Sequence, residues 1–243
     1  MKHLKIIISL ALGALAIQVG QGATEFPEYG IHHITHVPIT ISYPGVYVVD
    51  KDLVYTPLAS TNNFEKDNGT AIEINASNVS LDLQGHSLSD PTTFNVVYTS
   101  SRGIQVGIVG PAALANVLIL NGTINGFAYG IFAYGTNIVV EKVAARNQEN
   151  TGIQAYLIDH CQAYSPGFGP KGQILDPEYQ ESAGFVAWEV RDSLVEDFGT
   201  QIGMSVGHLA IGNTLQEGYI GIILGEGAAQ VDDTFIGVEY PYD

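Results

Sequence analysis

Two charged pairs, Asp159-His160 and Arg191-Asp192, contain the residue types that proton transfer requires. A carboxylate beside an arginine stays ionised, and a histidine beside a carboxylate can hold a proton near neutral pH. Brought together, the four residues would be able to abstract the proton alpha to a uronate carboxyl, with Arg191 as base or as charge stabiliser. The alternative for the same residues is an ion pair between strands and a histidine in a turn.

Three large aromatic residues, Tyr134, Tyr156 and Trp188, recur at one position of a repeated phrase. Each stands four positions after a glycine that opens a short alternating apolar segment. In such a segment the first and third positions after the glycine face inward, so the second and fourth face outward. The three rings therefore form an exposed stripe that is able to stack on sugar rings. An aromatic ladder that stabilises neighbouring strands is the alternative.

The elements that must position these residues are short strands in an internal repeat. In each repeat a small residue is followed by an apolar residue and then by positions that alternate between the inside and the outside. A turn rich in glycine or asparagine follows each of these phrases. The shortest spacings set a unit of 18 to 22 residues, and the longer ones indicate the same unit with an inserted loop. The phrases begin at Ala71, Gly103, Gly130, Gly152, Gly184, Gly203 and Gly221, with spacings of 32, 27, 22, 32, 19 and 18 residues.

This repeat predicts an all-β fold, a single-stranded right-handed parallel β-helix, or β-solenoid. No long stretch after residue 22 has apolar residues at helical spacing, so crossover helices between parallel strands are not expected. In a solenoid each coil supplies the crossover by winding around the core. If the register holds, Asp159 and His160 stand beside Arg191 and Asp192 in the next coil, near Tyr156 and Trp188.

Segments 69–90 (GTAIEINASNVSLDLQGHSLSD) and 116–148 (NVLILNGTINGFAYGIFAYGTNIVVEKVAARNQ) resemble the coils of right-handed β-helix proteins of the pectin-lyase-like superfamily. Segment 39–47 resembles the lead-in strand of the same proteins. The resemblance implies the fold and leaves the activity open, because that architecture hosts several chemistries. Polysaccharide lyases of that fold use acidic Ca²⁺ ligands and a basic catalytic residue, and no segment matches that pattern unambiguously.

The chain divides into three parts. Residues 1–22 have a basic start, an apolar run of about a dozen residues and small residues at the end, which predicts a signal peptide. Residues 23–68 are predicted to form an N-terminal cap with a lead-in strand, and residues 69–243 the β-helix. Insertions are expected at 90–101, 107–115 and 165–182, the first and third at one corner, where they would wall a groove. The mature chain is expected to lack a membrane span and to be secreted or periplasmic.

The charge narrows the choice of partners. The formal net charge is −16, and removal of Lys2 and Lys5 with the signal peptide takes it to −18. Nucleic acid is excluded as a partner, because phosphate binding needs clustered cations. An acidic polysaccharide would need bridging Ca²⁺ or a local cationic groove. Cys161 is the one cysteine, so no intramolecular disulfide is possible, and a buried thiol is expected.

No cofactor and no metal site is predicted, with Ca²⁺ as the one ion considered. A histidine cluster in the cap would be able to place two imidazoles on a metal, but a clear fourth ligand is missing. Two acidic pairs are interpreted as solvated turns rather than Ca²⁺ ligands. These residues are His32, His33 and His36 in the cap, and the pairs Glu196-Asp197 and Asp232-Asp233.

The sequence thus predicts an exported protein that binds or processes a polysaccharide on the outer face of its strands. If it is an enzyme, the class is a polysaccharide lyase or a glycoside hydrolase. The alternative is a non-catalytic structural or adhesin-like surface protein. The sequence leaves the oligomeric state and the covering of the C-terminal end open.

Overall fold

The structure is a computed structural model that describes residues 30–56, 69–91, 101–107, 114–164 and 183–242. The predicted signal peptide and the insertion at 165–182 lie outside these residues, and only the ends of the other two insertions are described. Within the described ranges every regular element is a β-strand, so the predicted all-β class is confirmed.

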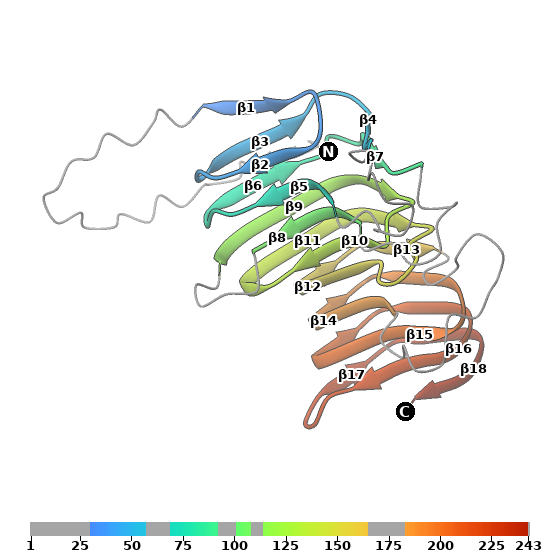
Figure 1. Cartoon of the computed structure of the whole chain (residues 1–243). Coiled ribbons are helices and arrows are strands. Elements are labelled where there is room, and N and C mark those ends of the chain that lie inside the picture. Colours follow the sequence, from blue (N-terminus) through green and yellow to red (C-terminus); the bar gives the residue numbers. More distant parts are fainter. Residues whose placement is uncertain (1–29, 57–68, 92–100, 108–113, 165–182, 243) are drawn as a thin grey trace, which may run out of the picture.

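Figure 1 shows the strands following one another along a long axis, from β1 at the blue end to β18 at the red end. The early strands are short, and later ones reach 12 to 18 residues. In chain order they are β1 Ile31–Ile34, β2 Ile39–Ile41, β3 Gly45–Val49, β4 Leu53–Val54, β5 Thr70–Ile74, β6 Val79–Asp82, β7 Ser87–Ser89, β8 Arg102–Val106, β9 Leu114–Asn125, β10 Tyr129–Ala133, β11 Gly135–Arg146, β12 Ile153–Asp159, β13 Gln162–Tyr164, β14 Ala183–Arg191, β15 Leu194–Ile211, β16 Thr214–Leu224, β17 Ala229–Val231 and β18 Thr234–Tyr242.

All strand pairings among the described residues are parallel. The phrases of the repeat lie side by side and in register, each paired with the next along the chain. Their first apolar residues form one column, which faces the core. The column runs through Ile39, Ile72, Ile104, Ile131, Ile153, Phe185, Met204 and Ile222.

The glycine that precedes this apolar residue is required by close approach of the backbones. A Cβ added at Gly130 would lie 2.4 Å from the carbonyl oxygen of Gly152, and one at Gly152 would lie 2.5 Å from that of Gly184. The same contact, at 2.6 to 2.7 Å, recurs at Gly103, Gly184, Gly203 and Gly221. A side chain at these positions would push neighbouring strands apart, which explains why the repeat keeps glycine there.

Left-handed residues turn the chain at its corners, and they too form columns. One column holds asparagines whose side chains bond in series: Asn137 Nδ2 donates to Asn116 Oδ1 at 2.7 Å, and Asn116 Nδ2 donates to Asn78 Oδ1 at 3.1 Å. The φ angles of the three lie between 55° and 59°. Asparagine tolerates this conformation better than most residues, so the turn chemistry of the repeat explains these positions.

The predicted architecture, a single-stranded right-handed parallel β-helix, is wrong. The parallel strands instead close into a barrel of seven strands, with the other strands hydrogen-bonded outside it. Long strands contribute to these pairings: β11 and β15 each contain a left-handed residue, Lys142 and Asp197, and pair with different neighbours on either side of it. A smaller closed path of pairings, through five strands, runs from β11 through β12, β14, β15 and β13 back to β11. The sequence indicated short strands ending at every turn, and so missed the closure.

The core is a continuous apolar cluster inside the sheet, in which Phe127, Phe185 and Phe198 are among the largest fully buried side chains. Strands β1 to β4, from the segment predicted as a cap, pair with later strands of the same sheet: β2 with β5, β3 with β6 and β4 with β7. In the described ranges, no helix has the length and hydropathy that crossing a membrane requires.

Candidate functional site

The aromatic residues predicted as a binding stripe lie on the outer surface, in or directly after parallel strands that are neighbours in the sheet. Tyr134 is 40% exposed, Tyr156 40% and Trp188 49%. Tyr156 and Trp188 occupy equivalent places in β12 and β14, because the residues on either side of them are paired. Tyr134 directly follows β10, whose Phe132 pairs with Gln154 of β12. We call these three residues the aromatic row.

A fourth ring extends the aromatic row. The imidazole of His208 stacks on the Trp188 indole, with centroids 5.3 Å apart and an interplanar angle of 11°. The register between β14 and β15 shifts opposite Trp188, which brings His208 into the row. Gly207 makes room for the indole, since a Cβ there would lie 2.9 Å from the Trp188 ring. The sequence pattern did not identify His208, because the bulge places it five positions after Gly203. The three residues of the aromatic row each stand four positions after their glycine.

At the Tyr134 end of the aromatic row, the cation of Arg102 lies close to neighbouring aromatic rings. The Phe132 ring meets the Tyr134 ring edge-on at 4.8 Å. The guanidinium carbon of Arg102 lies 5.0 Å from the Phe132 centroid and 5.8 Å from the Tyr129 centroid, within cation–π range. The sequence pattern did not identify Arg102, Tyr129 or Phe132, because the predicted stripe consists of aromatic residues at position four of the phrase.

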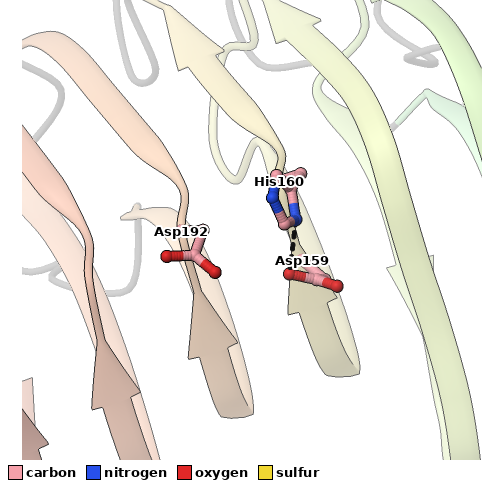
Figure 2. Close-up of side chains that lie close together, drawn as sticks. All are labelled: Asp159, His160 and Asp192. Carbon is pink, nitrogen blue, oxygen red and sulfur yellow. Dashed lines mark hydrogen bonds and ion pairs between the residues drawn. The ribbon is translucent and has the colours of Figure 1, made fainter. Parts of the chain in front are cut away.

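The predicted charged set is partly assembled. Asp159 and Arg191 are register partners in β12 and β14. Nδ1 of His160 lies 2.8 Å from Oδ1 of Asp159. Figure 2 shows Asp192 on the neighbouring strand facing this pair, and one ligand atom from each of the three residues lies within 4.8 Å of the others. Two carboxylates and one imidazole therefore share a small patch of surface.

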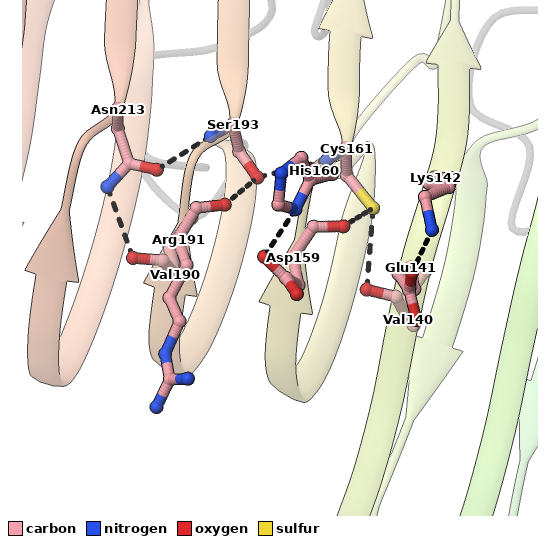
Figure 3. Close-up of polar contacts among 10 residues, drawn as sticks. All are labelled: Val140, Glu141, Lys142, Asp159, His160, Cys161, Val190, Arg191, Ser193 and Asn213. Carbon is pink, nitrogen blue, oxygen red and sulfur yellow. Dashed lines mark hydrogen bonds and ion pairs between the residues drawn. The ribbon is translucent and has the colours of Figure 1, made fainter. Parts of the chain in front are cut away.

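Arg191 does not join that patch. Its guanidinium donates to Oε1 of Glu189 at 2.8 Å, and in Figure 3 its side chain extends away from His160. The bond to Glu189, aided by the negative charges of Asp159 and Asp192, raises the pKa of Arg191 above its usual range. A general base must give up its proton before it can act. The geometry therefore favours Arg191 as a positive charge and disfavours it as the proton acceptor of a lyase.

The same corner of the fold holds His160 and Asp192 in place. Both are left-handed, with φ of 50° and 44°, and Lys142 takes the same conformation in the preceding strand. The backbone N–H of His160 donates to the Arg191 carbonyl at 3.1 Å, and that of Asp192 donates to the Ile211 carbonyl at 2.9 Å. Equivalent corner residues thus project side by side from adjacent strands.

Beneath this corner runs a buried chain of hydrogen bonds (Figure 3). In each step a backbone N–H donates to the side-chain oxygen of the next strand: Cys161 to Ser193 at 3.0 Å, Ser193 to Asn213 at 3.0 Å, and Asn213 to Asp233 at 2.7 Å. Buried polar groups that are paired in this way stabilise one register of the strands. The chain of bonds therefore fixes the corner from which Asp159, His160 and Asp192 project.

Cys161 is 1% exposed, which confirms the predicted buried thiol. Burial raises the pKa of this thiol to about 12, so the nucleophilic thiolate is scarce at neutral pH. We expect no reaction of Cys161 with Ellman's reagent at pH 8 in the native protein, and one thiol per chain in denaturant. Rapid native labelling would contradict this placement. The readout is unambiguous because the chain has one cysteine.

Asp233 is the last residue in the buried chain of hydrogen bonds, and one of its carboxylate oxygens is left without a partner. Its Oδ2 is buried without a hydrogen-bond partner, and burial raises the pKa of the carboxyl. A carboxyl whose pKa is higher in the folded state than in the unfolded state stabilises the folded state at pH values below the unfolded-state pKa. This stabilisation is lost as the pH rises through the folded-state pKa. Asp233→Asn should therefore stabilise the protein at pH 7 by up to about 1 kcal/mol and flatten its acid-range pH dependence.

Thermal unfolding between pH 3 and pH 7 measures this effect, with Asp232→Asn as the control at the exposed neighbouring carboxyl. A lower melting temperature of Asp233→Asn at pH 7, relative to the control, would show that the charged form is the better partner for Asn213.

The other candidate metal ligands are not gathered. Nδ1 of His33 lies 2.7 Å from Oδ1 of Asp50, whereas the ring of His32 stacks on Tyr47 at 4.8 Å. Among the residues that the structure describes, Asp159, His160 and Asp192 form the one group of three that is spaced to hold a metal ion. His36 and the two acidic pairs named above belong to no such group there.

Comparison with known protein families, curated proteins and solved structures finds no match to this chain. The resemblance to the pectin-lyase-like superfamily is therefore wrong, since neither a family match nor the closed barrel supports it. The segments that suggested it are explained by general features: glycine at close backbone contacts and asparagine at left-handed corners.

Proposed function

We propose that this chain is an exported protein that binds a neutral polysaccharide along the aromatic row of Tyr134, Tyr156 and Trp188. The observation that carries the proposal is the exposure of these three large rings, 40 to 49%, in or directly after neighbouring strands. Parallel strands lie about 4.8 Å apart, so the row presents apolar surface at a regular, short spacing. Exposed apolar patches of this kind mark binding surfaces.

The charge favours a neutral ligand. A chain with a net charge of −16 repels an acidic polysaccharide unless cations bridge the two. Binding is favoured over processing, because Glu189 holds the basic group of the predicted catalytic set. The stacked His208 fixes the indole of Trp188, and a ring fixed in advance loses less entropy when a ligand docks.

A structural surface protein is the second candidate, and the ring contacts themselves favour it. Trp188 on His208 and Tyr134 on Phe132 are contacts that an aromatic ladder between strands also makes. The two functions differ in one respect, namely whether the outer edges of the rings contact a ligand.

Electrophoresis of the native protein through gels that contain neutral polysaccharides tests the proposal, with polygalacturonate as the acidic comparison. We expect a neutral glucan, xylan or mannan to retard the wild type, and Trp188→Ala to weaken binding at least about tenfold. Tyr240→Ala is the matched control, since Tyr240 is 48% exposed and also packs edge-on against a ring, that of Tyr219.

Retardation of the control but not of Trp188→Ala supports the aromatic row as the binding surface. Equal retardation of both variants, or no retardation of the wild type by any polysaccharide, overturns the proposal and favours the structural function.

A further inference from the structure

We propose that Asp159, His160 and Asp192 form a binding site for one divalent cation of the Zn²⁺ type. This site is independent of the polysaccharide proposal, because it uses none of the residues of the aromatic row. It is assembled at the ends of two strands, with Asp159 the last residue of β12, His160 just after it, and Asp192 just after β14 (Figure 2).

The distances suit ligands of a single ion. Zn²⁺ lies about 2.0 to 2.2 Å from nitrogen and carboxylate oxygen ligands, so two ligands of one ion are roughly 3 to 3.5 Å apart. The Nδ1 of His160 and the Oδ1 of Asp159 are 2.8 Å apart, and the full set of three lies within 4.8 Å. His160 and Asp192 are exposed and Asp159 is half-buried, so small side-chain rotations are enough to close the set.

The charges near the site leave its carboxylates available. Arg191 and Lys142 act on these carboxylates through their charges, but each forms its direct ion pair with another residue, Arg191 with Glu189 and Lys142 with Glu141. Among the described residues, Asp159 has His160 as its one ion-pair partner and Asp192 has no ion pair. Two carboxylates held this close repel each other, and a bound cation removes that repulsion.

The backbone at the three ligand residues is fixed before any ion binds. His160 and Asp192 occupy the same left-handed corner of adjacent strands, and each has its N–H bonded to the following strand. The buried hydrogen bonds of Cys161 and Ser193 lie directly after these two residues. With the backbone fixed, only side-chain rotations are lost on binding, which lowers the entropic cost of holding an ion.

The ligand types select the ion. Ca²⁺ prefers six to eight oxygen ligands, and this site offers two carboxylates and a nitrogen. Zn²⁺ and its neighbours in the first transition row accept imidazole together with carboxylate, and three protein ligands with water completing the shell is a common arrangement. Zn²⁺ should therefore bind more tightly than Ca²⁺.

Isothermal titration of the metal-free full chain with ZnCl₂, and separately with CaCl₂, tests the proposal. We expect one Zn²⁺ per chain at this site, and His160→Asn and Asp192→Asn should each weaken it at least about tenfold. His33→Asn is the matched control, because His33 also stands beside a carboxylate, that of Asp50, but belongs to no group of three possible metal ligands within the described ranges. Circular dichroism verifies that each variant is folded.

Co²⁺ gives a second readout, since a His-carboxylate site changes its visible absorption, and this change should vanish in His160→Asn. Zn²⁺ affinity that is the same in wild type and His160→Asn overturns the proposal. Tighter binding of Ca²⁺ than of Zn²⁺ also overturns it, as does equal loss of affinity in the His33→Asn control.

Discussion

Replacing Gly152 with alanine is expected to lower the free energy of unfolding by about 2 to 3 kcal/mol, the cost of forcing extra volume into a packed interior. The added Cβ would lie 2.5 Å from the carbonyl oxygen of Gly184 and 3.2 Å from the Cβ of Ala163. The first contact is to backbone, which cannot rotate away. Strands β12 and β14 would have to separate, and that separation would disturb their ladder of hydrogen bonds.

Equilibrium unfolding in urea measures this effect. Ala71 provides the reverse control, since it stands where the later phrases have glycine, and Ala71→Gly should cost only about 1 kcal/mol by loosening the chain. If Gly152→Ala is as stable as the wild type, the backbones are not in the close contact that the structure describes.

Replacing Asn213 with alanine is expected to cost about 3 kcal/mol, because two buried groups lose their partners at about 1 to 3 kcal/mol each. The Asn213 side chain is fully buried. Its Oδ1 accepts the N–H of Ser193 at 3.0 Å, and its Nδ2 donates to the carbonyl of Val190 at 3.1 Å. Both groups are buried, so each loses a partner in the interior.

Asn137→Gly is the control for this variant, since it removes an amide from the exposed asparagine column and leaves a residue that tolerates φ of 55°. We expect its loss to stay below about 0.5 kcal/mol, because water replaces an exposed amide partner. Urea unfolding of both variants measures the two losses in the free energy of unfolding. Similar losses would mean that the buried chain of hydrogen bonds stabilises the fold no more than the exposed asparagine column does.

Much of the local structure was predictable from the sequence, for reasons now visible in the strands. Inward and outward positions follow from alternation, so the column from Ile72 to Ile222 and the exposure of Trp188 could be inferred. The parallel register of the phrases also could be inferred, since glycine recurs at the first position of every phrase after Ala71. These features depend on residues close together in the sequence, where pattern is informative.

The global architecture was not predictable in the same way. A single left-handed residue, such as Asn121 in β9 or Lys142 in β11, redirects a strand without ending it. The pattern alone does not distinguish such a corner from a turn that separates two strands. The lengths of β9, β11 and β15, and with them the closure of the barrel, therefore escaped the sequence reasoning.

In the candidate site, too, some features were predictable from the sequence and others were not. Asp159, His160 and Asp192 were placed together by register alone. The partner of Arg191 was missed, because Glu189 lies two positions away on the same face and competes with the predicted set. His208 was missed since its place depends on a bulge, and Arg102 since its contacts are to the faces of rings rather than to charges.

Trp188 is the one tryptophan of the chain, so its fluorescence reports on the aromatic row alone. The most direct measurement of the account is therefore a titration of the wild type with a neutral polysaccharide, following tryptophan emission and its quenching by acrylamide. We expect a shifted emission and weaker quenching as the ligand covers the indole. Binding that leaves both unchanged would contradict it, because the ligand would then occupy another surface.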